Sequence, residues 1–347
     1  MTGDIKPRSS GFSRRPEGTR AVLWCPSKPR RGARYGSEGG TLTTDPTAEA
    51  RIPGVAMQAH GLTKRFKKKV ALDNVDLSIP AGSVTALVGP NGAGTTTLIK
   101  VCMAFERPNS GHVEVDGVDP WKHRSAALRR VGYVPQTPAV YRGLSVEDHL
   151  SMARSLHSTF DTEYSRRRLS QLGIPLDQRA DTLSGGQAAQ LGLAIALGTR
   201  AKVLLLDEPL ANLDPLARRE FIQVLVDAIR TDGSTAVLSS HIVTDVEEAC
   251  DRLAILGNGK ILLDCPLHEA RQQHILTDSA APPKGGVAIG SFAGKGLTRL
   301  TLWRMPEAGA GVTAGGDAAP APDTASLEEV VLGYLAAGRG TTGLQLN

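Results

Sequence analysis

The clearest pattern along the chain is a series of short apolar runs separated by longer segments of helical composition. Three runs, Ser83–Val88, Lys202–Leu206 and Ser234–Ser239, are rich in Val, Leu and Ala and are bounded by polar residues or glycine. Their length and composition predict buried strands. Because such segments alternate with helical ones from Met57 to about Asp264, the pattern predicts an α/β fold with a mostly parallel sheet covered by helices.

Two later parts of the chain depart from this alternation. Between Pro138 and Thr182 the strand pattern stops and charged helical sequence replaces it, which predicts an inserted helical lobe. From about Pro266 onward Gly, Ala and Pro become more frequent, and Gly309–Pro322 has the composition of a linker. Ser326–Gly338 predicts a short helix, because it begins with a capping serine and early acids and ends with glycine.

The N-terminal tail carries the net charge. The chain has 347 residues and a formal charge of +5; residues 1 to 53 hold ten Arg or Lys against five Asp or Glu, and the remainder holds 30 of each. The tail has no periodic apolar face, so we expect it to be disordered; alternatively, translation starts at Met57. We therefore divide the chain into a basic tail (1–56), one large domain (57–264, with the helical insert at about 138–182) and a C-terminal extension (265–347).

Composition excludes several classes of protein. No apolar stretch of about 18 residues predicts a membrane span, and the N-terminus lacks the order of a secretory signal, so we expect the chain to stay in the cytosol. Cys25, Cys102, Cys250 and Cys265 show no CxxC spacing, which argues against a zinc site or a disulfide framework. We expect them to be reduced, with Cys102 and Cys250 in the core.

A glycine-rich segment, Gly89-Pro-Asn-Gly-Ala-Gly-Thr-Thr-Thr97, follows a predicted strand and precedes the apolar helix Leu98–Phe105. This context is typical of a phosphate-binding loop, in which glycines let backbone N–H groups converge on anionic oxygens at a helix N-terminus. The pattern also requires a lysine after Gly94. Thr95 stands at that position.

Two carboxylates come directly after the apolar run that ends at Leu206. Asp207 and Glu208 precede a proline and would lie at the C-terminal edge of a buried strand, where active sites of open α/β sheets are found. Asp207 could hold Mg²⁺ there, and Glu208 could polarise an attacking water as a general base. The alternative is that the two acids only begin a turn.

The segment Leu183-Ser-Gly-Gly-Gln187 precedes another apolar helix. One interpretation is a helix cap, with Ser184 as the capping residue and the glycines forming the turn. A second interpretation is compatible with the first, since free amides at a capped helix end can bind the γ-phosphate of a nucleotide held by another subunit.

Two further polar residues have ordinary structural explanations when each is taken alone. His241 follows the predicted strand Ser234–Ser239, and a single histidine is more often structural than catalytic. Gln136 can equally be a polar residue at the end of a strand. Their order along the chain, relative to the glycine-rich segment and the two carboxylates, makes both residues candidates for the same functional site.

In this order of motifs, the sequence resembles the ATPase subunits of ATP-binding cassette (ABC) transporters over roughly residues 57 to 264. The resemblance implies a P-loop NTPase fold with an antiparallel β subdomain and an inserted helical subdomain. It implies ATP and Mg²⁺ as cofactors, with Thr96, Gln136 and Asp207 as metal ligands and Glu208, Gln136 and His241 as catalytic residues. The implied nucleotide-binding residues are Phe66, which would stack on adenine, Gly89, Asn91, Gly92, Gly94, Thr95, Thr96 and Thr97 of the loop, and the signature Ser184, Gly185, Gly186 and Gln187.

Family resemblance also implies partners. Two such subunits form a head-to-tail dimer that sandwiches two ATP molecules, with Ala211–Asp214 as a dimer contact, and each closure drives a permease in the membrane. The chain would therefore lie at the cytoplasmic face of the cell membrane, with Tyr141 and Glu147 of the helical insert as permease contacts. The short C-terminal extension looks more like that of drug or antibiotic exporters than like that of importers with a regulatory lobe.

Thr95 leaves two hypotheses for the activity. A charged donor to phosphate contributes about 1.5–3 kcal/mol to binding, so its loss predicts weak hydrolysis. The chain is then either a transport ATPase with an altered site or a nucleotide-binding subunit that closes without hydrolysis and could complete a partner's site. A cassette protein that acts on ribosomes or DNA is disfavoured, because one copy of each motif and no long insert are present; we expect no nucleic-acid partner.

Overall fold

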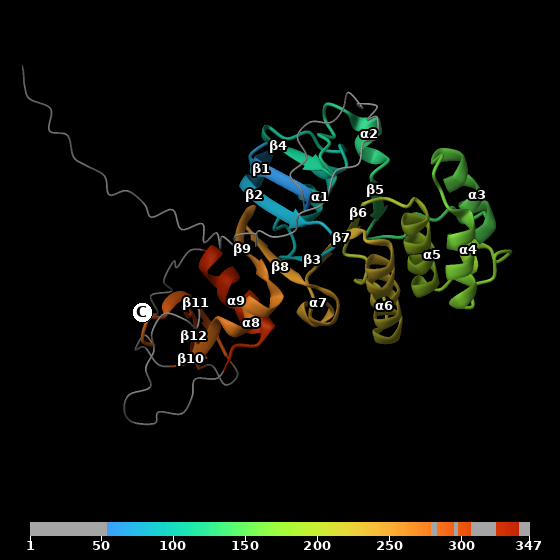
Figure 1. Cartoon of the computed structure of the whole chain (residues 1–347). Helices are drawn as coiled ribbons and strands as arrows, with labels where there is room; N and C mark the ends of the chain where they lie inside the picture. Colours follow the sequence, from blue (N-terminus) through green and yellow to red (C-terminus); the bar gives the residue numbers. More distant parts are fainter. Residues whose placement is uncertain (1–53, 279–282, 295–297, 307–323, 340–347) are drawn as a thin grey trace, which may run out of the picture.

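Six strands form the central sheet of the computed structural model, in the order β5-β6-β7-β3-β8-β9 (Figure 1). The structure describes residues 54–278, 283–294, 298–306 and 324–339. Neighbouring strands are parallel from β5 to β8, and β9 is an antiparallel edge. The strands are β3 (Val84–Val88), β5 (Val131–Val134), β6 (Val203–Asp207), β7 (Thr235–Ser240), β8 (Arg252–Gly257) and β9 (Lys260–Pro266). The three strands predicted from apolar runs are confirmed, each starting one residue later than expected.

The central sheet is buried on both faces, which explains why its strands are continuous apolar runs. In β3, Leu87 belongs to the core formed with α1 and the antiparallel sheet, whereas Ala86 belongs to the core formed with the helices on the opposite side. The helices beside the sheet are α1 (Thr95–Cys102), α2 (Arg124–Leu128), α5 (Gly185–Gly198), α6 (Pro215–Asp232) and α7 (Val243–Ala249).

A second, antiparallel sheet has the order β2-β1-β4 and confirms the expected β subdomain. It consists of β1 (Val55–Phe66), β2 (Lys69–Pro80) and β4 (Ser110–Val115). β1 and β2 form a hairpin in which Phe66 pairs with Lys69. The first part of β2 lies against the glycine-rich loop, so the hairpin forms one wall of the site described below.

The predicted helical lobe is present and lies at the far side of the molecule from the β1–β2 hairpin (Figure 1). α3 (Val146–Leu156) and α4 (Thr162–Gln171) have their own small core with α5, and a short 3₁₀ turn, η1 (Ala180–Thr182), leads into α5. Of the two expected permease contacts, Tyr141 is 61% exposed, whereas the Glu147 carboxylate is paired with Arg166.

The C-terminal extension contains more structure than its composition predicted. After α8 (Leu267–Gln272), a three-stranded sheet of order β10-β12-β11 follows, made of β10 (His274–Thr277), β11 (Val287–Ala293) and β12 (Arg299–Arg304). The expected terminal helix is α9 (Leu327–Gly338), capped by Ser326. α9 packs against this sheet and against β8. The predicted linker, residues 309–322, and the tail, residues 1–53, lie outside the described residues.

The cysteines in the described part of the chain are free thiols in the interior. Cys102 and Cys250 are core residues as predicted, and Cys265 is buried too. Burial raises the pKa of the Cys102 and Cys265 thiols to about 12, so both are protonated at neutral pH. Among the described helices, none combines the length and the apolar character that a membrane span requires.

Candidate functional site

The glycine-rich loop connects the end of β3 to α1, and the helix begins earlier than the sequence predicted. α1 begins at Thr95, three residues before the expected Leu98, and it ends at Cys102 instead of Phe105. Its N-cap residue, Gly94, has φ +117° and offers no side-chain cap to the first-turn amides. Those amides are therefore available to an anion in front of the loop.

Close packing explains two of the glycines. A Cβ on Gly94 would lie 2.5 Å from the carbonyl oxygen of Ala71 in β2, and a Cβ on Gly89 would lie 2.5 Å from the carbonyl oxygen of Leu256 in β8. Gly94 thus fixes the loop against the hairpin. Gly89 fixes it against the sheet from behind, so its contribution to the site is through packing.

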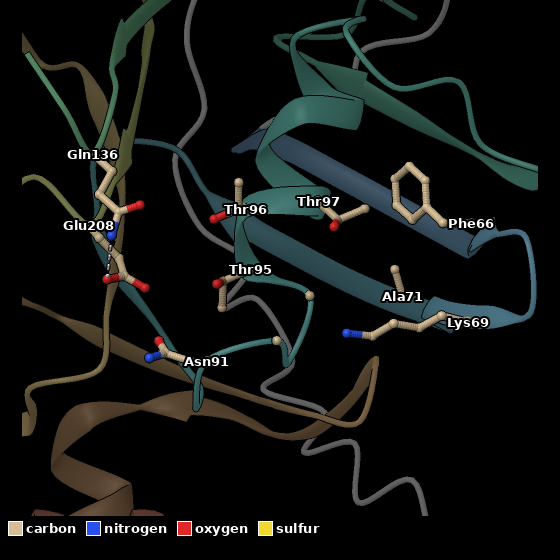
Figure 2. Close-up of a pocket in the computed structure, with 11 residues that line it drawn as sticks. Phe66, Lys69, Ala71, Asn91, Thr95, Thr96, Thr97, Gln136 and Glu208 are labelled. Atoms are coloured by element: carbon tan, nitrogen blue, oxygen red, sulfur yellow. Dashed lines mark hydrogen bonds between the residues drawn. The ribbon is translucent and has the colours of Figure 1, made fainter.

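A cavity of about 420 Å³ opens in front of the loop (Figure 2). Its walls come from the β1–β2 hairpin, the loop with the first turn of α1, and the ends of β5 and β6. Most of the predicted nucleotide-binding residues of the loop meet here, together with Phe66. The residues that line the cavity are Phe66, Lys69, Ala71, Asn91, Gly92, Gly94, Thr95, Thr96, Thr97, Gln136 and Glu208.

Asp207 ends β6 directly beside the first turn of α1. Its side chain is buried, and its Oδ1 accepts hydrogen bonds from the Thr96 hydroxyl (2.9 Å) and from the Ser239 hydroxyl (3.2 Å). A carboxylate and a hydroxyl in contact are the oxygen ligands that Mg²⁺ prefers, and Mg²⁺ commonly takes only one or two carboxylates from the protein.

Glu208 is held in an uncommon backbone conformation. Its φ is +46°, in the left-handed region, and its backbone N–H donates a 2.7 Å hydrogen bond to the Ser239 hydroxyl. The carboxylate Oε2 accepts from Gln136 Nε2 (3.3 Å; Figure 2) and lies 3.1 Å from His241 Nδ1. A non-glycine residue in this region costs about 1–3 kcal/mol, and the hydrogen bond to Ser239 helps to hold Glu208 in it.

The three residues predicted as catalytic are therefore brought together by the sheet. Gln136 follows β5, Glu208 follows β6 and His241 follows β7, and these strands are neighbours in the sheet. Because parallel strands present their carboxyl ends at one edge, residues far apart in the sequence meet there. The arrangement makes Glu208 the central group, with a hydrogen-bond donor and an imidazole on its carboxylate.

The signature residues lie elsewhere. Ser184 caps α5, accepting from the Gln187 N–H while the Gln187 side chain accepts from the Ser184 N–H, so the helix-cap interpretation is confirmed. A Cβ on Gly186 would lie 3.1 Å from the Ala217 Cβ of α6. Ser184, Gly185, Gly186 and Gln187 are not among the residues that line the cavity.

Sequence reasoning missed two residues of the site. Ser239 was included in a predicted strand, but its hydroxyl connects Asp207 with the Glu208 backbone, a role that only the strand order β6-β7 reveals. Lys69 lines the cavity from the start of β2. Nothing in the spacing of the motifs indicates it, because its position depends on the hairpin pairing.

Comparisons with known proteins agree on one family. The family model of the ABC transporters matches residues 72–211. The lantibiotic transport ATP-binding protein SrtF of Streptococcus pyogenes is 32% identical over 210 residues, which cover 60% of this chain and 90% of that protein. The Fe(3+) ions import ATP-binding protein FbpC of Pasteurella multocida is 33% identical over 213 residues, which cover 60% of this chain and 61% of that protein. A solved structure of an ATP-binding subunit of an ABC transporter has a TM-score of 0.57 at 27% identity, covering 62% of this chain and 92% of that one.

Proposed function

The chain belongs to the ATP-binding subunits of ABC transporters, and from this we propose that it binds ATP with Mg²⁺ in the cavity before the glycine-rich loop and hydrolyses it to power a separate permease. Subunits of this family work with permease components, and this one would do so at the cytoplasmic face of the membrane. One observation carries the proposal. Gln136 and His241 both contact the Glu208 carboxylate, and this group lies near the glycine-rich loop, where the first turn of α1 has no side-chain cap.

The residues of the site would take different roles in binding and hydrolysis, according to the chemistry of their side chains. Phe66, 40% exposed at the cavity wall, offers a flat apolar face to a base. Thr96, Asp207 and Gln136 offer oxygen ligands to Mg²⁺, which when bound would neutralise phosphate charge. Glu208 would accept a proton from the attacking water, with Gln136 and His241 holding its carboxylate in place.

Dimer formation is part of the proposal. Ser184 to Gln187 lie at the N-terminus of α5, outside the cavity of their own chain. Serving the nucleotide of a second subunit is therefore the use that fits their position and the amides of Gly185 and Gly186, which the capping box does not engage. Closure of the two subunits around ATP would then move the permease.

We propose that transport is directed outward. The support comes from the relative for lantibiotic transport and from the terminal helix α9. The relative for Fe(3+) import is equally similar in sequence, and the folded sheet β10-β12-β11 removes the expected contrast with importers that carry a folded lobe after the domain. Transport by inside-out vesicles that contain the cognate permease would test this: uptake of solute into them supports export.

Thr95 supports a second candidate function, a subunit that binds ATP and closes without hydrolysing it. Thr95 lines the cavity, and its short side chain lacks the charge that the loop pattern requires. Loss of one charge-stabilising donor costs about 10²- to 10³-fold in turnover.

The two candidate functions, ATP hydrolysis and closure without hydrolysis, are separated by measuring steady-state ATP turnover. The proteins compared are purified wild type, Glu208→Gln and Thr95→Lys. For the proposed ATPase, Glu208→Gln falls at least about tenfold below wild type, because the base is lost. Thr95→Lys turns over at least as fast as wild type, and at most about 10³-fold faster. If wild type is as slow as Glu208→Gln while Thr95→Lys turns over, the second candidate is correct. Equal rates for wild type and Thr95→Lys would show that Thr95 does not limit hydrolysis.

A further inference from the structure

A lysine outside the glycine-rich loop places its ammonium group against that loop. Lys69 is the first residue of β2, and its side chain extends along the cavity toward the loop (Figure 2). Its Nζ lies 3.5 Å from the position that a Cβ on Gly92 would occupy. This is the loop in which Thr95 replaces the expected lysine.

The backbone at Lys69 is fixed relative to the loop by contacts just beyond it. Gly94 approaches the Ala71 carbonyl so closely that a Cβ there would lie at 2.5 Å. The Asp73 N–H donates to the Gly259 carbonyl (2.8 Å), and the Gly259 N–H donates to the Ala93 carbonyl (2.9 Å). The start of β2, the β8–β9 turn and the loop therefore form one connected unit, which keeps the root of Lys69 beside the phosphate loop.

Two nearby lysines, Lys64 and Lys260, are engaged elsewhere. Lys64 forms an ion pair with Glu106 (3.0 Å) and lies 4.7 Å from the centre of the Phe66 ring, and Lys260 forms an ion pair with Asp73 (3.1 Å). Lys69 is exposed and is the one Lys or Arg among the described residues that line the cavity. Its Nζ has no ion pair or hydrogen bond to another residue of the described part.

The ammonium group lies beside the loop that leads into the uncapped first turn of α1, and no carboxylate of the described residues is paired with it. Such an arrangement favours an anion at the loop. We propose that Lys69 binds the phosphate chain of the nucleotide and supplies the positive charge that Thr95 lacks. The proposal rests on the proposed nucleotide site and deepens it. Since Phe66 and Lys69 are paired across the hairpin, one element would hold both the base and the phosphates.

Binding of MgATP to the purified full chain tests the proposal by isothermal titration calorimetry. The variants are Lys69→Met, Thr95→Lys and the double variant. Lys68→Met is the matched control, because Lys68 is also exposed and lies in the adjoining turn but does not line the cavity. Lys69→Met should raise the Kd about 10- to 100-fold, the effect of losing one charged donor to phosphate. Lys68→Met should stay within about twofold of wild type, since exposed charges distant from the ligand contribute little.

Rescue distinguishes a phosphate contact from a structural effect. If Lys69 supplies the missing charge, adding Thr95→Lys to Lys69→Met restores binding to near the wild-type value, and the melting temperatures without nucleotide stay equal. If Lys69→Met binds MgATP with the same Kd as wild type, Lys69 does not bind the phosphates, and the proposed function is unaffected. Absence of binding in both wild type and Thr95→Lys overturns the proposed function itself.

Discussion

At the scale of single residues, the loop depends on a glycine whose absence of a side chain serves two purposes. Gly94 has φ +117°, a conformation that L side chains rarely adopt, and it lies directly against the Ala71 carbonyl. The same residue begins α1 and sets the distance between the loop and β2. A side chain here would disturb the helix start and the cavity wall together.

We therefore predict that Gly94→Ala lowers the free energy of unfolding by about 1–3 kcal/mol and weakens ATP binding. Gly192→Ala is the matched control, because Gly192 lies within α5 with no atom within 4 Å of an added Cβ; alanine there should stabilise the protein by about 0.5–1 kcal/mol. Urea unfolding measures both. A stable Gly94→Ala variant with normal ATP binding would contradict the packing argument.

A second residue makes stability depend on pH. His274 is buried, with Nδ1 2.8 Å from the Ala270 carbonyl oxygen and Nε2 3.1 Å from the Tyr334 hydroxyl. Burial lowers its pKa to about 4. Below the unfolded-state pKa of about 6.5 the unfolded chain takes up a proton that the folded chain does not, so stability falls as pH drops from 6.5 to 4.

This residue should account for up to about 3 kcal/mol of the stability lost over that pH range. Urea unfolding at pH 7.5 and pH 4.5 checks this when wild type is compared with His274→Gln, which keeps polar atoms but cannot titrate. The variant should lose less stability between the two pH values. An equal loss in both proteins would assign the pH dependence to other groups.

At the scale of elements, α5 begins with a residue that combines a cap and a proposed phosphate contact. Ser184→Asp separates the two, because aspartate caps helices as well as serine does but adds a negative charge. We predict a free energy of unfolding within about 0.5 kcal/mol of wild type and loss of the ATP-induced dimer, as measured by sedimentation velocity.

Ser326→Ala is the control for stability alone, since Ser326 caps α9 in the same way. It should cost about 0.5–2 kcal/mol and leave dimer formation intact. An ATP-induced dimer that survives Ser184→Asp would leave Ser184 with a capping role only.

The helices and strands differ in how well the sequence predicted them. The buried strands β3, β6 and β7 could be predicted because burial on both faces requires unbroken apolar runs. The start of α1 could not, because its first turn is Thr95 to Thr97 and carries no apolar periodicity. β11 was missed because its residues are at most half-buried and include glycine, so neither alternation nor a continuous apolar run indicates it. Lys69 was missed because it reaches the loop through strand pairing.

At the scale of the whole molecule, the C-terminal sheet shares a core with the central sheet. Leu302 of β12 and Val330 of α9 belong to the same buried cluster as Leu253 and Ile255 of β8. A Cβ on Gly333 would lie 2.4 Å from Leu302 Cδ2, so α9 packs closely on this strand. The described part of the extension therefore packs as part of the same folded unit as the central sheet.

We predict that Leu302→Ala lowers the free energy of unfolding of the described unit by about 2–5 kcal/mol, because it leaves a cavity in the shared core. Unfolding should remain a single transition when followed by circular dichroism and by tryptophan fluorescence, since Trp303 lies in the C-terminal sheet and Trp121 near the antiparallel sheet. Two separate transitions would show that the extension folds independently.

The two-residue turn between Phe66 and Lys69 sets the register of the β1–β2 hairpin. Lys67 in this turn has φ +51°, and the turn sets which side chains of the two strands face each other. Side chains alternate between the faces of a strand, so one residue inserted here would turn either the aromatic ring or the ammonium group away from the ligand. The length of this turn thus decides whether the proposed base contact of Phe66 and the proposed phosphate contact of Lys69 can lie on the same face of one hairpin.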